Sequence, residues 1–368
     1  MSSSQLARRP HVCFVNSLRG LGGAELWFLD AARGLQERGI RTSLVAQPGS
    51  PLLDLARQGG LDAAAVPIRC DGAPWTLVRL WRRFRRTGVT AIVCNLTKDL
   101  KAAGLAGRLA GVPVRLASRE SDFPLKSKFY YRWYFGRVAT GVLANSEATR
   151  STVLASAPWL PGDRIHLLYK GIDTDRFRPL PPAPSARGPS VGFVGQLVAR
   201  KGLATLMDAW RRLEAADWPV PPRLRLAGVG PLRQDLERWR AGLRRPAAVE
   251  LAGFVTDVPG FWAACRCGVL PSLAEGFGLA AAEAAACGLP IVATRASSLP
   301  EIVRDGATGL LVAPGDPRAL AAALDRLLRD GPLADALGAA GRNLVVQRFD
   351  RERCLDRLVS LTCTEVSP

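Results

Sequence analysis

The chain has 368 residues, of which 48% are hydrophobic and 22% charged, a composition typical of a folded protein and not of a disordered one. This length exceeds one ordinary hydrophobic core and suits two α/β domains. The net charge of +18 arises from 50 basic and 32 acidic residues. A nucleic acid or an anionic membrane would explain it, and so would an arginine-rich, GC-biased coding sequence.

Targeting segments and metal motifs are not apparent. No run of eighteen apolar residues occurs, so we predict no transmembrane span. The first ten residues lack the apolar stretch of a secretory signal, so none is predicted there. Eight cysteines are scattered through mostly apolar segments, which favours reduced thiols in a cytoplasmic protein. Cys265 and Cys267 form a Cys-x-Cys pair, but the two histidines lie far away in the sequence, so no metal site is predicted.

Strand patterns alternate with helical patterns in the first half of the chain. Strands are expected at His11–Asn16, Arg41–Ala46, Ala63–Pro67, Ala91–Asn95 and Val114–Ser118. The helical segments between them fall at about 24–38, 51–58, 76–86 and 101–110. This alternation predicts a doubly wound parallel sheet.

The proline-rich stretch 179–189 follows and predicts an interdomain linker. The alternation then restarts, with strands expected at Ser190–Gly195, Arg223–Ala227, Val249–Ala252, Gly268–Pro271 and Pro290–Ala293. A last helical segment begins near residue 317 and breaks near Phe349. We therefore predict an α/β protein with two Rossmann-like domains, 1–178 and 190–348, facing across a cleft, and a helix in 349–368 that packs back toward the first domain.

The richest candidate site is the stretch 271–289, which predicts a strand, a loop and a helix. The loop carries Glu275 and Gly278, and the helix begins near Leu279. A helix start offers unpaired N–H groups and the positive end of the dipole, which suits a phosphate. The carboxylates of Glu275 and Glu283 can accept hydrogen bonds from sugar hydroxyls. The alternative is an ordinary strand–turn–helix with one solvated glutamate.

Two glycine-containing turns are further candidates. Arg200 and Lys201 follow the first strand of the second domain and can neutralise a diphosphate, unless they are simply exposed residues at a helix start. Gly20, Gly22 and Gly23 follow the first strand of the chain, but a clean Gly-x-Gly-x-x-Gly pattern and the acidic residue of a dinucleotide site are absent. This turn is expected to let backbone amides approach a ligand.

Two stretches of the first domain, 75–86 and 123–137, combine basic and aromatic residues. Such segments can rest on an anionic bilayer or stack on single-stranded nucleic acid. The alternative is an amphipathic helix that packs Leu80 and Phe84 on the sheet while its arginines face water. We consider the membrane surface the stronger of the two partner hypotheses.

The spacing Glu275-x7-Glu283, with Phe277 and Gly278 after the first glutamate, resembles the donor-binding motif of retaining family 4 glycosyltransferases of the GT-B fold. The resemblance extends, in order, over Gly195–Gly202, Ala227–Glu237, Gly253–Pro259, Ala286–Thr294 and Leu299–Val312. It therefore covers almost the whole second domain.

The resemblance implies a role for each matched residue. Glu283 would bind the ribose hydroxyls and Glu275 those of the transferred sugar. Lys201, assisted by Arg200, would stabilise the leaving diphosphate, which makes these two and Glu275 the expected catalytic residues. The remaining donor contacts would come from Gly22, Gly23, Gln196, Gly253, Phe254, Val255, Phe277, Gly278 and Leu279.

The chain departs from the family pattern in two places. Gln196 stands where many members have an arginine, so it can bind a phosphate oxygen but supplies no charge. Several members carry a histidine just after the fifth strand, where this chain has Arg119, Glu120 and Asp122. Arg119 and Glu120 are retained as expected acceptor-side contacts.

The resemblance implies retaining transfer of a sugar from a nucleotide-sugar to a hydroxyl of a glycan or lipid-linked acceptor, in the synthesis of a cell-envelope polysaccharide or lipopolysaccharide. No cofactor or bound metal is expected. The protein would work in the cytoplasm, or peripherally on the inner face of the cytoplasmic membrane. The alternatives are a sugar-nucleotide epimerase or hydrolase of the same two-domain shape and a non-catalytic nucleotide-sugar-binding protein. Nucleic-acid binding would leave the paired glutamates without a purpose.

Overall fold

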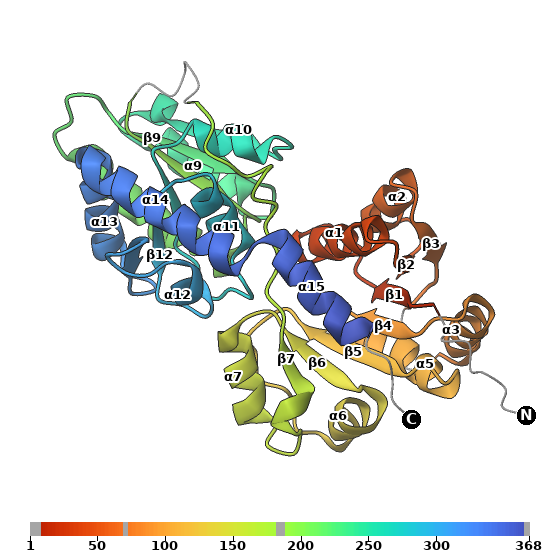
Figure 1. Cartoon of the computed structure of the whole chain (residues 1–368). Coiled ribbons are helices and arrows are strands. Elements are labelled where there is room, and N and C mark those ends of the chain that lie inside the picture. Colours follow the sequence, from red (N-terminus) through yellow and green to blue (C-terminus); the bar gives the residue numbers. More distant parts are fainter. Residues whose placement is uncertain (1–8, 69–72, 182–187, 364–368) are drawn as a thin grey trace, which may run out of the picture. The chain divides into compact units, whose positions relative to one another are not determined.

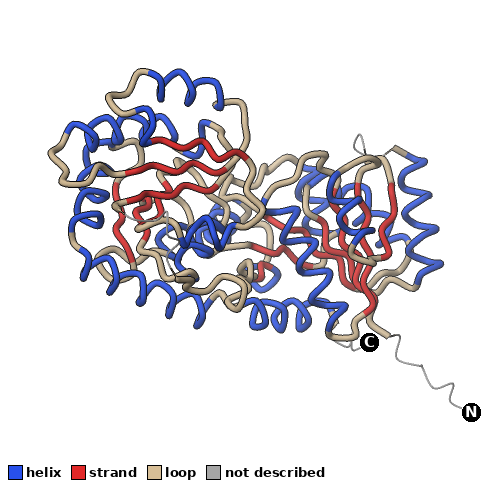
Figure 2. The backbone as a smooth tube through the Cα atoms, turned by 90° about the horizontal axis from the view of Figure 1, so that it is seen from above, coloured by secondary structure: helices blue, strands red, loops and turns tan. Residues whose placement is uncertain are grey.

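The computed structural model describes residues 9–68, 73–181 and 188–363. The chain forms two compact units (Figure 1). The boundary between them falls after Tyr169. The chain returns to the first unit at Cys354. Each unit has a parallel β-sheet flanked by helices (Figure 2), as the sequence predicts. Within the described ranges, no helix combines the length and the apolar character needed to span a membrane.

The first unit contains a seven-stranded parallel sheet with the strand order β3-β2-β1-β4-β5-β6-β7. The strands are β1 His11–Asn16, β2 Arg41–Ala46, β3 Asp62–Ala65, β4 Ala91–Cys94, β5 Val114–Arg119, β6 Gly141–Ala144 and β7 Ile165–Leu167. The helices are α1 Gly23–Glu37, α2 Pro51–Gln58, α3 Pro74–Thr87, α4 Thr97–Asp99, α5 Leu105–Leu109, α6 Phe129–Trp133 and α7 Glu147–Ser156. All five strands expected here are present, and β6 and β7 were not predicted.

The second unit contains a six-stranded parallel sheet with the order β10-β9-β8-β11-β12-β13. Its strands are β8 Ser190–Val194, β9 Arg223–Ala227, β10 Val249–Gly253, β11 Cys267–Leu270, β12 Ile291–Thr294 and β13 Gly309–Val312. Its helices are α8 Leu203–Ala215, α9 Arg233–Ala241, α10 Val258–Ala263, α11 Leu279–Ala286, α12 Leu299–Ile302, α13 Pro317–Arg329 and α14 Gly331–Arg348. The five strands expected here are again present, and β13 was not predicted.

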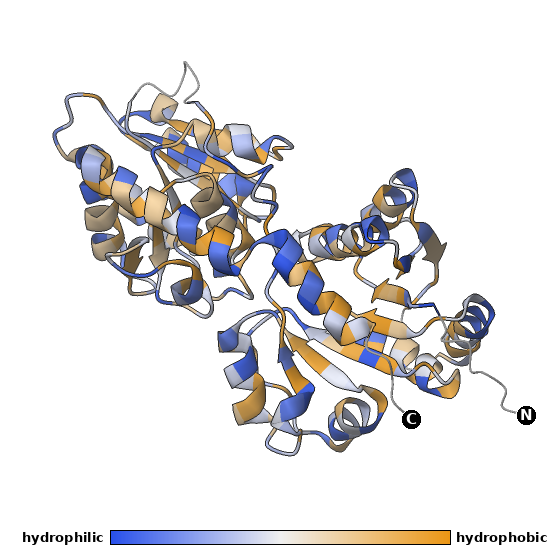
Figure 3. Cartoon of the chain, viewed as in Figure 1, coloured by the Kyte–Doolittle hydropathy of each residue, from blue (hydrophilic) through white to orange (hydrophobic). Residues whose placement is uncertain are grey.

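The sheet of the first unit is covered on both faces, which explains the uninterrupted apolar strands. Along β1, Val12 and Phe14 belong to one buried cluster, whereas Cys13 and Val15 belong to another. Successive side chains of a strand point to opposite faces, so every position of such a strand must be apolar. Hydrophobic strands accordingly lie between helices of mixed character (Figure 3).

The last helical segment of the chain breaks twice, whereas the sequence predicts a single break near Phe349. Asp330 ends α13, and its side chain accepts a hydrogen bond from the Leu333 N–H to cap α14. A proline in the first turn of α14 cannot continue the hydrogen-bonding pattern of α13. The final helix, α15 Arg351–Thr362, follows the second break.

The expected domain boundary at residue 178 differs from the observed one, because 170–178 belong to the second unit. The Ile172 N–H donates to the Phe349 carbonyl (2.7 Å), and the Arg351 N–H donates to the Ile172 carbonyl (3.0 Å). These bonds join the segment to the end of α14, so the proline-rich stretch 179–189 does not mark the division. Part of that stretch, 182–187, lies outside the described residues.

The C-terminal helix contributes to the core of the first unit. Leu355 and Leu358 of α15 are buried in the same cluster as Phe14 and Leu44. Asp356 lies 3.0 Å from Arg38 of α1 in an ion pair. The chain therefore contributes residues from both of its ends to the first unit.

Candidate functional site

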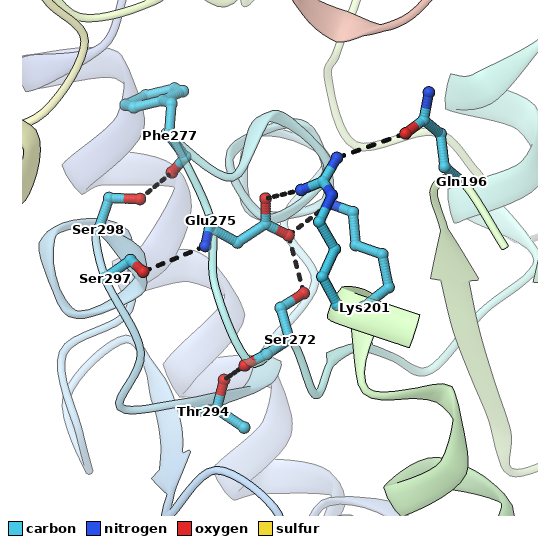
Figure 4. Close-up of polar contacts among 9 residues, drawn as sticks. Gln196, Lys201, Ser272, Glu275, Phe277, Thr294, Ser297 and Ser298 are labelled. Carbon is cyan, nitrogen blue, oxygen red and sulfur yellow. Dashed lines mark hydrogen bonds and ion pairs between the residues drawn. The ribbon is translucent and has the colours of Figure 1, made fainter. Parts of the chain in front are cut away.

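Glu275 lies in the loop between β11 and α11, and its carboxylate is buried with only 5% of the residue exposed. Lys201 Nζ lies 2.5 Å from Oε1 of Glu275, and the Ser272 hydroxyl donates to the same oxygen at 2.8 Å (Figure 4). Arg200 Nη1 lies 4.0 Å from the other carboxylate oxygen. Burying either charge by itself would cost free energy, because the charge would lose its contact with water. The attraction between the two charges offsets this cost.

The backbone between β8 and α8 brings Lys201 to this carboxylate. Lys201 ends a short 3-10 turn, and Gly202 follows with φ 68° as the N-cap residue of α8. A Cβ at Gly202 would lie 1.8 Å from the Pro271 carbonyl oxygen, so only glycine permits this approach to the end of β11. The Leu273 N–H then donates to the Arg200 carbonyl at 2.8 Å, which joins the two loops directly.

Gln196 and Arg200 form an exposed pair next to the contact between Lys201 and Glu275. Arg200 Nη2 donates to the Gln196 side-chain oxygen at 3.3 Å, while half of the Arg200 side chain is exposed. A guanidinium group therefore lies next to the position where the sequence lacks the family's arginine. A role of Arg200 and Gln196 toward a diphosphate stays a prediction.

The expected phosphate site lies at the start of α11, where its role stays a prediction. Gly278 adopts φ 91° as the residue before the helix, and Leu279 begins it. A left-handed conformation of this kind favours glycine, and the first N–H groups of a helix have no acceptor in a preceding turn. Phe277 is buried, and its carbonyl accepts a hydrogen bond from the Ser298 hydroxyl at 2.9 Å.

Glu283 lies one turn into α11 and is half-buried among alanines. Burial raises the pKa of the Glu283 carboxyl from 4.5 to about 7, and nearby Arg176 opposes this rise. A carboxyl group that titrates near neutrality in an apolar helix is typical of a binding position. Glu275 and Glu283 share no hydrogen bond among the described contacts, and the roles expected of them toward two parts of one ligand stay a prediction.

The segment 253–255 lies at the same edge of the sheet. Gly253 ends β10 with φ 71°, and its carbonyl accepts the Gly228 N–H at 2.7 Å. The side chain of Phe254 is 67% exposed, so it is available to a planar ligand. Since β8, β9, β10 and β11 are parallel neighbours, their carboxyl ends bring these loops and Glu275 to one edge, where ligands of such folds bind.

Gly22 and Gly23 lie in the first unit at the start of α1. Beneath them, Glu25 is buried and its Oε1 accepts hydrogen bonds from the side-chain amides of Asn16 (3.2 Å) and Asn95 (3.3 Å). Asn16 is the last residue of β1 and Asn95 directly follows β4, and these are the neighbouring strands where the strand order of the sheet reverses. Sequence reasoning missed this buried network, and a role of Gly22 and Gly23 in donor binding stays a prediction.

The two expected acceptor-side residues bind within their own loop. Arg119 ends β5, and its guanidinium donates to the Phe123 carbonyl at 2.6 Å. Burial lowers the pKa of Arg119. The Ser118 hydroxyl donates to the Glu120 carboxylate. A role of Arg119 and Glu120 toward an acceptor also stays a prediction.

The described residues contain no group of three or more histidine, cysteine or acidic side chains placed to hold a metal ion. Asp173, Thr174 and Asp175 have the Asp-x-Asp spacing found in some metal sites, which the sequence analysis overlooked. Asp173 Oδ1 instead accepts the backbone N–H groups of Asp175 (3.2 Å) and Arg176 (2.9 Å). That this protein needs no metal stays a prediction.

Hydroxyl groups around Glu275 were also missed by sequence reasoning. Besides Ser272, these are Thr294 at the end of β12 and Ser297 and Ser298 after it, and all three bind the loop that carries Glu275 (Figure 4). They lie in or beside the short segment 295–298, between two stretches that resemble the family. The two consecutive serines were the available signal.

Two family models match the chain, one in each unit. The model described as Glycosyltransferase Family 4 matches residues 21–176, and the model described as Glycosyl transferases group 1 matches residues 188–330. Together they cover most of the described sequence, in the order expected for a protein of the GT-B fold.

Characterised relatives belong to the same class. LpsE of Rhizobium meliloti, a lipopolysaccharide core biosynthesis glycosyltransferase, is 26% identical and covers 94% of this chain and 96% of its own length. LpsD of the same organism, with the same description, is 27% identical over 92% and 94%. The D-inositol 3-phosphate glycosyltransferase of Frankia alni is 37% identical, but the match covers only 49% of each protein.

Solved structures share the fold over almost the entire chain. HepE of Anabaena in complex with UDP superposes with a TM-score of 0.83 at 21% identity, covering 96% of this chain and 100% of that one. A glycosyltransferase of Rickettsia africae superposes with a TM-score of 0.85 at 17% identity, covering 96% and 98%. The two-sheet architecture is therefore that of GT-B proteins.

Proposed function

The chain belongs to the family 4 and group 1 glycosyltransferases, and from this premise we propose the reaction that it performs. It transfers a sugar from a nucleoside diphosphate donor to a hydroxyl group of a glycan or lipid-linked acceptor. The configuration at the anomeric carbon is retained, and no metal ion takes part. The alternatives, an epimerase or hydrolase and a non-catalytic binding protein, would use the same donor site without an acceptor.

The observation that carries this proposal is the buried contact between Lys201 and Glu275 beside the start of α11. During transfer, the bond from the anomeric carbon to the diphosphate oxygen breaks, and its electron pair leaves with the diphosphate. The acceptor oxygen bonds to the same carbon, and its proton moves to the departing diphosphate. The negative charge that develops on the diphosphate is stabilised by Lys201, by Arg200 and by the N–H groups at the start of α11.

The donor is expected to be a uridine diphosphate sugar, since HepE of similar fold binds UDP and UDP-glucose. UDP present at 100 times its dissociation constant should add about 2.7 kcal/mol of stability, or roughly 5–10 °C in the melting temperature of the unit that binds it. A thermal-shift series with UDP, GDP and ADP measures this. Stabilisation by GDP alone would assign a different donor, and no stabilisation by any nucleotide would contradict the site.

Turnover separates the transferase from its alternatives. Donor consumption should depend on an added acceptor and give a product with the anomeric configuration of the donor, which NMR of the product measures. Equal consumption without acceptor would favour the hydrolase or epimerase. The full-length similarity to LpsE and LpsD supports a core oligosaccharide of lipopolysaccharide as the acceptor to test first.

An anionic membrane surface is the proposed location of the acceptor, and α3 supports it. This helix contains five arginines and no acidic residue, and Trp75 at its start is 87% exposed. It packs against α5, whose Arg108 lies over the ring of Trp133. Phe129, which begins α6, is 83% exposed. Basic and aromatic side chains thus border one another across three helices, as in surfaces that bind anionic lipid headgroups.

Neutralising this surface should release the protein from vesicles. Arg83 is excluded from the change because it pairs with Asp62 at 2.8 Å. Replacing Arg79, Arg82, Arg85 and Arg86 by glutamine should weaken binding to phosphatidylglycerol vesicles at low salt by about 100-fold or more, since each exposed arginine contributes about 1 kcal/mol. Vesicle co-sedimentation measures the change.

The matched control replaces exposed arginines of the second unit that, like those chosen in α3, take part in no ion pair among the described contacts. These are Arg212, Arg244, Arg245 and Arg318, and their replacement should leave vesicle binding unchanged. An equal loss of vesicle binding in both variants would show that binding depends only on the net charge of the protein. Release of the wild type from vesicles by a short single-stranded oligonucleotide would favour nucleic acid as the partner instead.

A further inference from the structure

Ser297 has an unusual backbone conformation. Its φ is 51°, and it is the one non-glycine residue with positive φ in the described part of the chain. A side chain in the left-handed region crowds the following carbonyl oxygen, so this conformation costs free energy unless something compensates for it. Ser297 lies in the turn between β12 and α12, next to the loop that carries Glu275.

The Ser297 hydroxyl provides the compensation. Its Oγ accepts the backbone N–H of Glu275 at 3.1 Å (Figure 4). Two neighbours bind the same loop on either side: the Thr294 hydroxyl donates to the Ser272 carbonyl at 2.5 Å, and the Ser298 hydroxyl donates to the Phe277 carbonyl at 2.9 Å. Thr294 and Ser298 are fully buried, so no water replaces these bonds.

These three hydroxyls, here called the hydroxyl clasp, fix the loop before, at and after Glu275. The bond from Ser297 is the central one, because it reaches the residue whose carboxylate contacts Lys201. If this bond is lost, the backbone of Glu275 can rotate while the outer two bonds keep the loop folded. The carboxylate would then lose its alignment without a loss of the overall structure.

We propose that Ser297 is a positioning residue for sugar transfer, whose hydroxyl orients the Glu275 backbone so that the carboxylate faces Lys201 and the sugar of the donor. The inference rests on the proposed function, since it assigns the orientation of Glu275 to one hydrogen bond. The strained conformation of Ser297 follows from this role, because the hydroxyl reaches the Glu275 N–H from that conformation.

Two substitutions separate the hydroxyl from the backbone. Ser297→Gly removes both the hydroxyl and the strain, whereas Ser297→Ala removes the hydroxyl and keeps the strain. Both should lower kcat about 10-fold, because both release Glu275. The melting temperature should be higher for Ser297→Gly than for Ser297→Ala. Activity would then depend on the Ser297 hydroxyl group, whereas stability would depend on the strain of the backbone at this position.

A binding measurement adds a readout that a purely structural role would not move. UDP lacks the sugar that Glu275 contacts, so its dissociation constant should change less than twofold in both variants, whereas that of the UDP-sugar should rise. Ser297→Asn, which tolerates positive φ and offers a side-chain oxygen, should recover part of kcat. Calorimetric titration and steady-state kinetics of the full chain measure these quantities.

Ser190→Ala is the matched control. It removes a buried hydroxyl from the opposite end of β8, where Ser190 donates to the Ala264 carbonyl at 3.1 Å. It should lower stability and leave kcat unchanged. A kcat within twofold of wild type in Ser297→Gly would overturn the inference, as would a loss of UDP binding equal to that of the UDP-sugar. Absence of transfer by the wild type itself would instead contradict the proposed function.

Discussion

Lys201→Ala is expected to lower kcat by about 10²- to 10³-fold, the usual effect of removing one group that stabilises charge in a transition state. Lys201 is largely buried, with 13% of its side chain exposed, and it contacts Glu275 in the loop before α11. A buried charge acts on the leaving diphosphate with little screening by water. Steady-state kinetics with a saturating acceptor measures the loss.

The same change leaves Glu275 buried without its main partner, so stability should also fall, on the order of 3 kcal/mol. The double variant Lys201→Met with Glu275→Gln removes both charges and should recover most of that stability while activity stays low. Arg211→Ala removes a positive charge from the exposed face of α8 and serves as the control. If the stable double variant regained wild-type kcat, Lys201 would have only a structural role.

Glu283→Gln is expected to abolish the dependence of donor affinity on pH around neutrality. Because burial raises the pKa of Glu283 to about 7, the carboxyl is partly protonated in the free protein at that pH. Ribose hydroxyls are bound best by the ionised carboxylate, so the wild-type KM for the UDP-sugar should rise as the pH falls below about 7. The variant should bind about 10- to 100-fold more weakly at pH 8, with little change toward pH 6.

Stability without donor should show the opposite trend. The folded protein holds the Glu283 proton more tightly than the unfolded chain, whose pKa is near 4.5, so stability falls as the pH rises from about 4.5 to about 7. Glu283→Gln should lack this fall, which denaturant unfolding at several pH values measures. Glu250→Gln removes an exposed carboxylate of β10, and this control variant should still show the fall in stability. A variant and wild type with parallel pH profiles would show that Glu283 does not titrate in this range.

The strands were predictable because a parallel strand buried on both faces is a short apolar run bounded by turn residues. The same argument explains one omission, since β7 has only three residues and contains His166, which interrupts the apolar run. Strand β6 is as short and as apolar as β4, so its pattern was present in the sequence and was overlooked. Strand β13 begins at Gly309, which must be glycine because a Cβ there would lie 2.4 Å from the Ile291 carbonyl oxygen. Such close contacts are visible only in three dimensions.

The sequence by itself determined the fold class, and its resemblance to a known family identified Glu275, Glu283 and Lys201 as site residues. Only the tertiary structure decided how they meet. Lys201 and Glu275 are 74 residues apart, and their contact depends on the approach of Gly202 to the end of β11. The raised pKa of Glu283 likewise arises from burial by the fold.

The tertiary structure alone also decided the domain boundary and the conformation of Ser297. The boundary follows from backbone bonds between Ile172 and the end of α14, which no local pattern encodes. Serine rarely adopts positive φ, so sequence reasoning expects an ordinary turn at residue 297. Local patterns predict elements because they depend on neighbouring residues, whereas a site depends on contacts between loops that are distant in the chain.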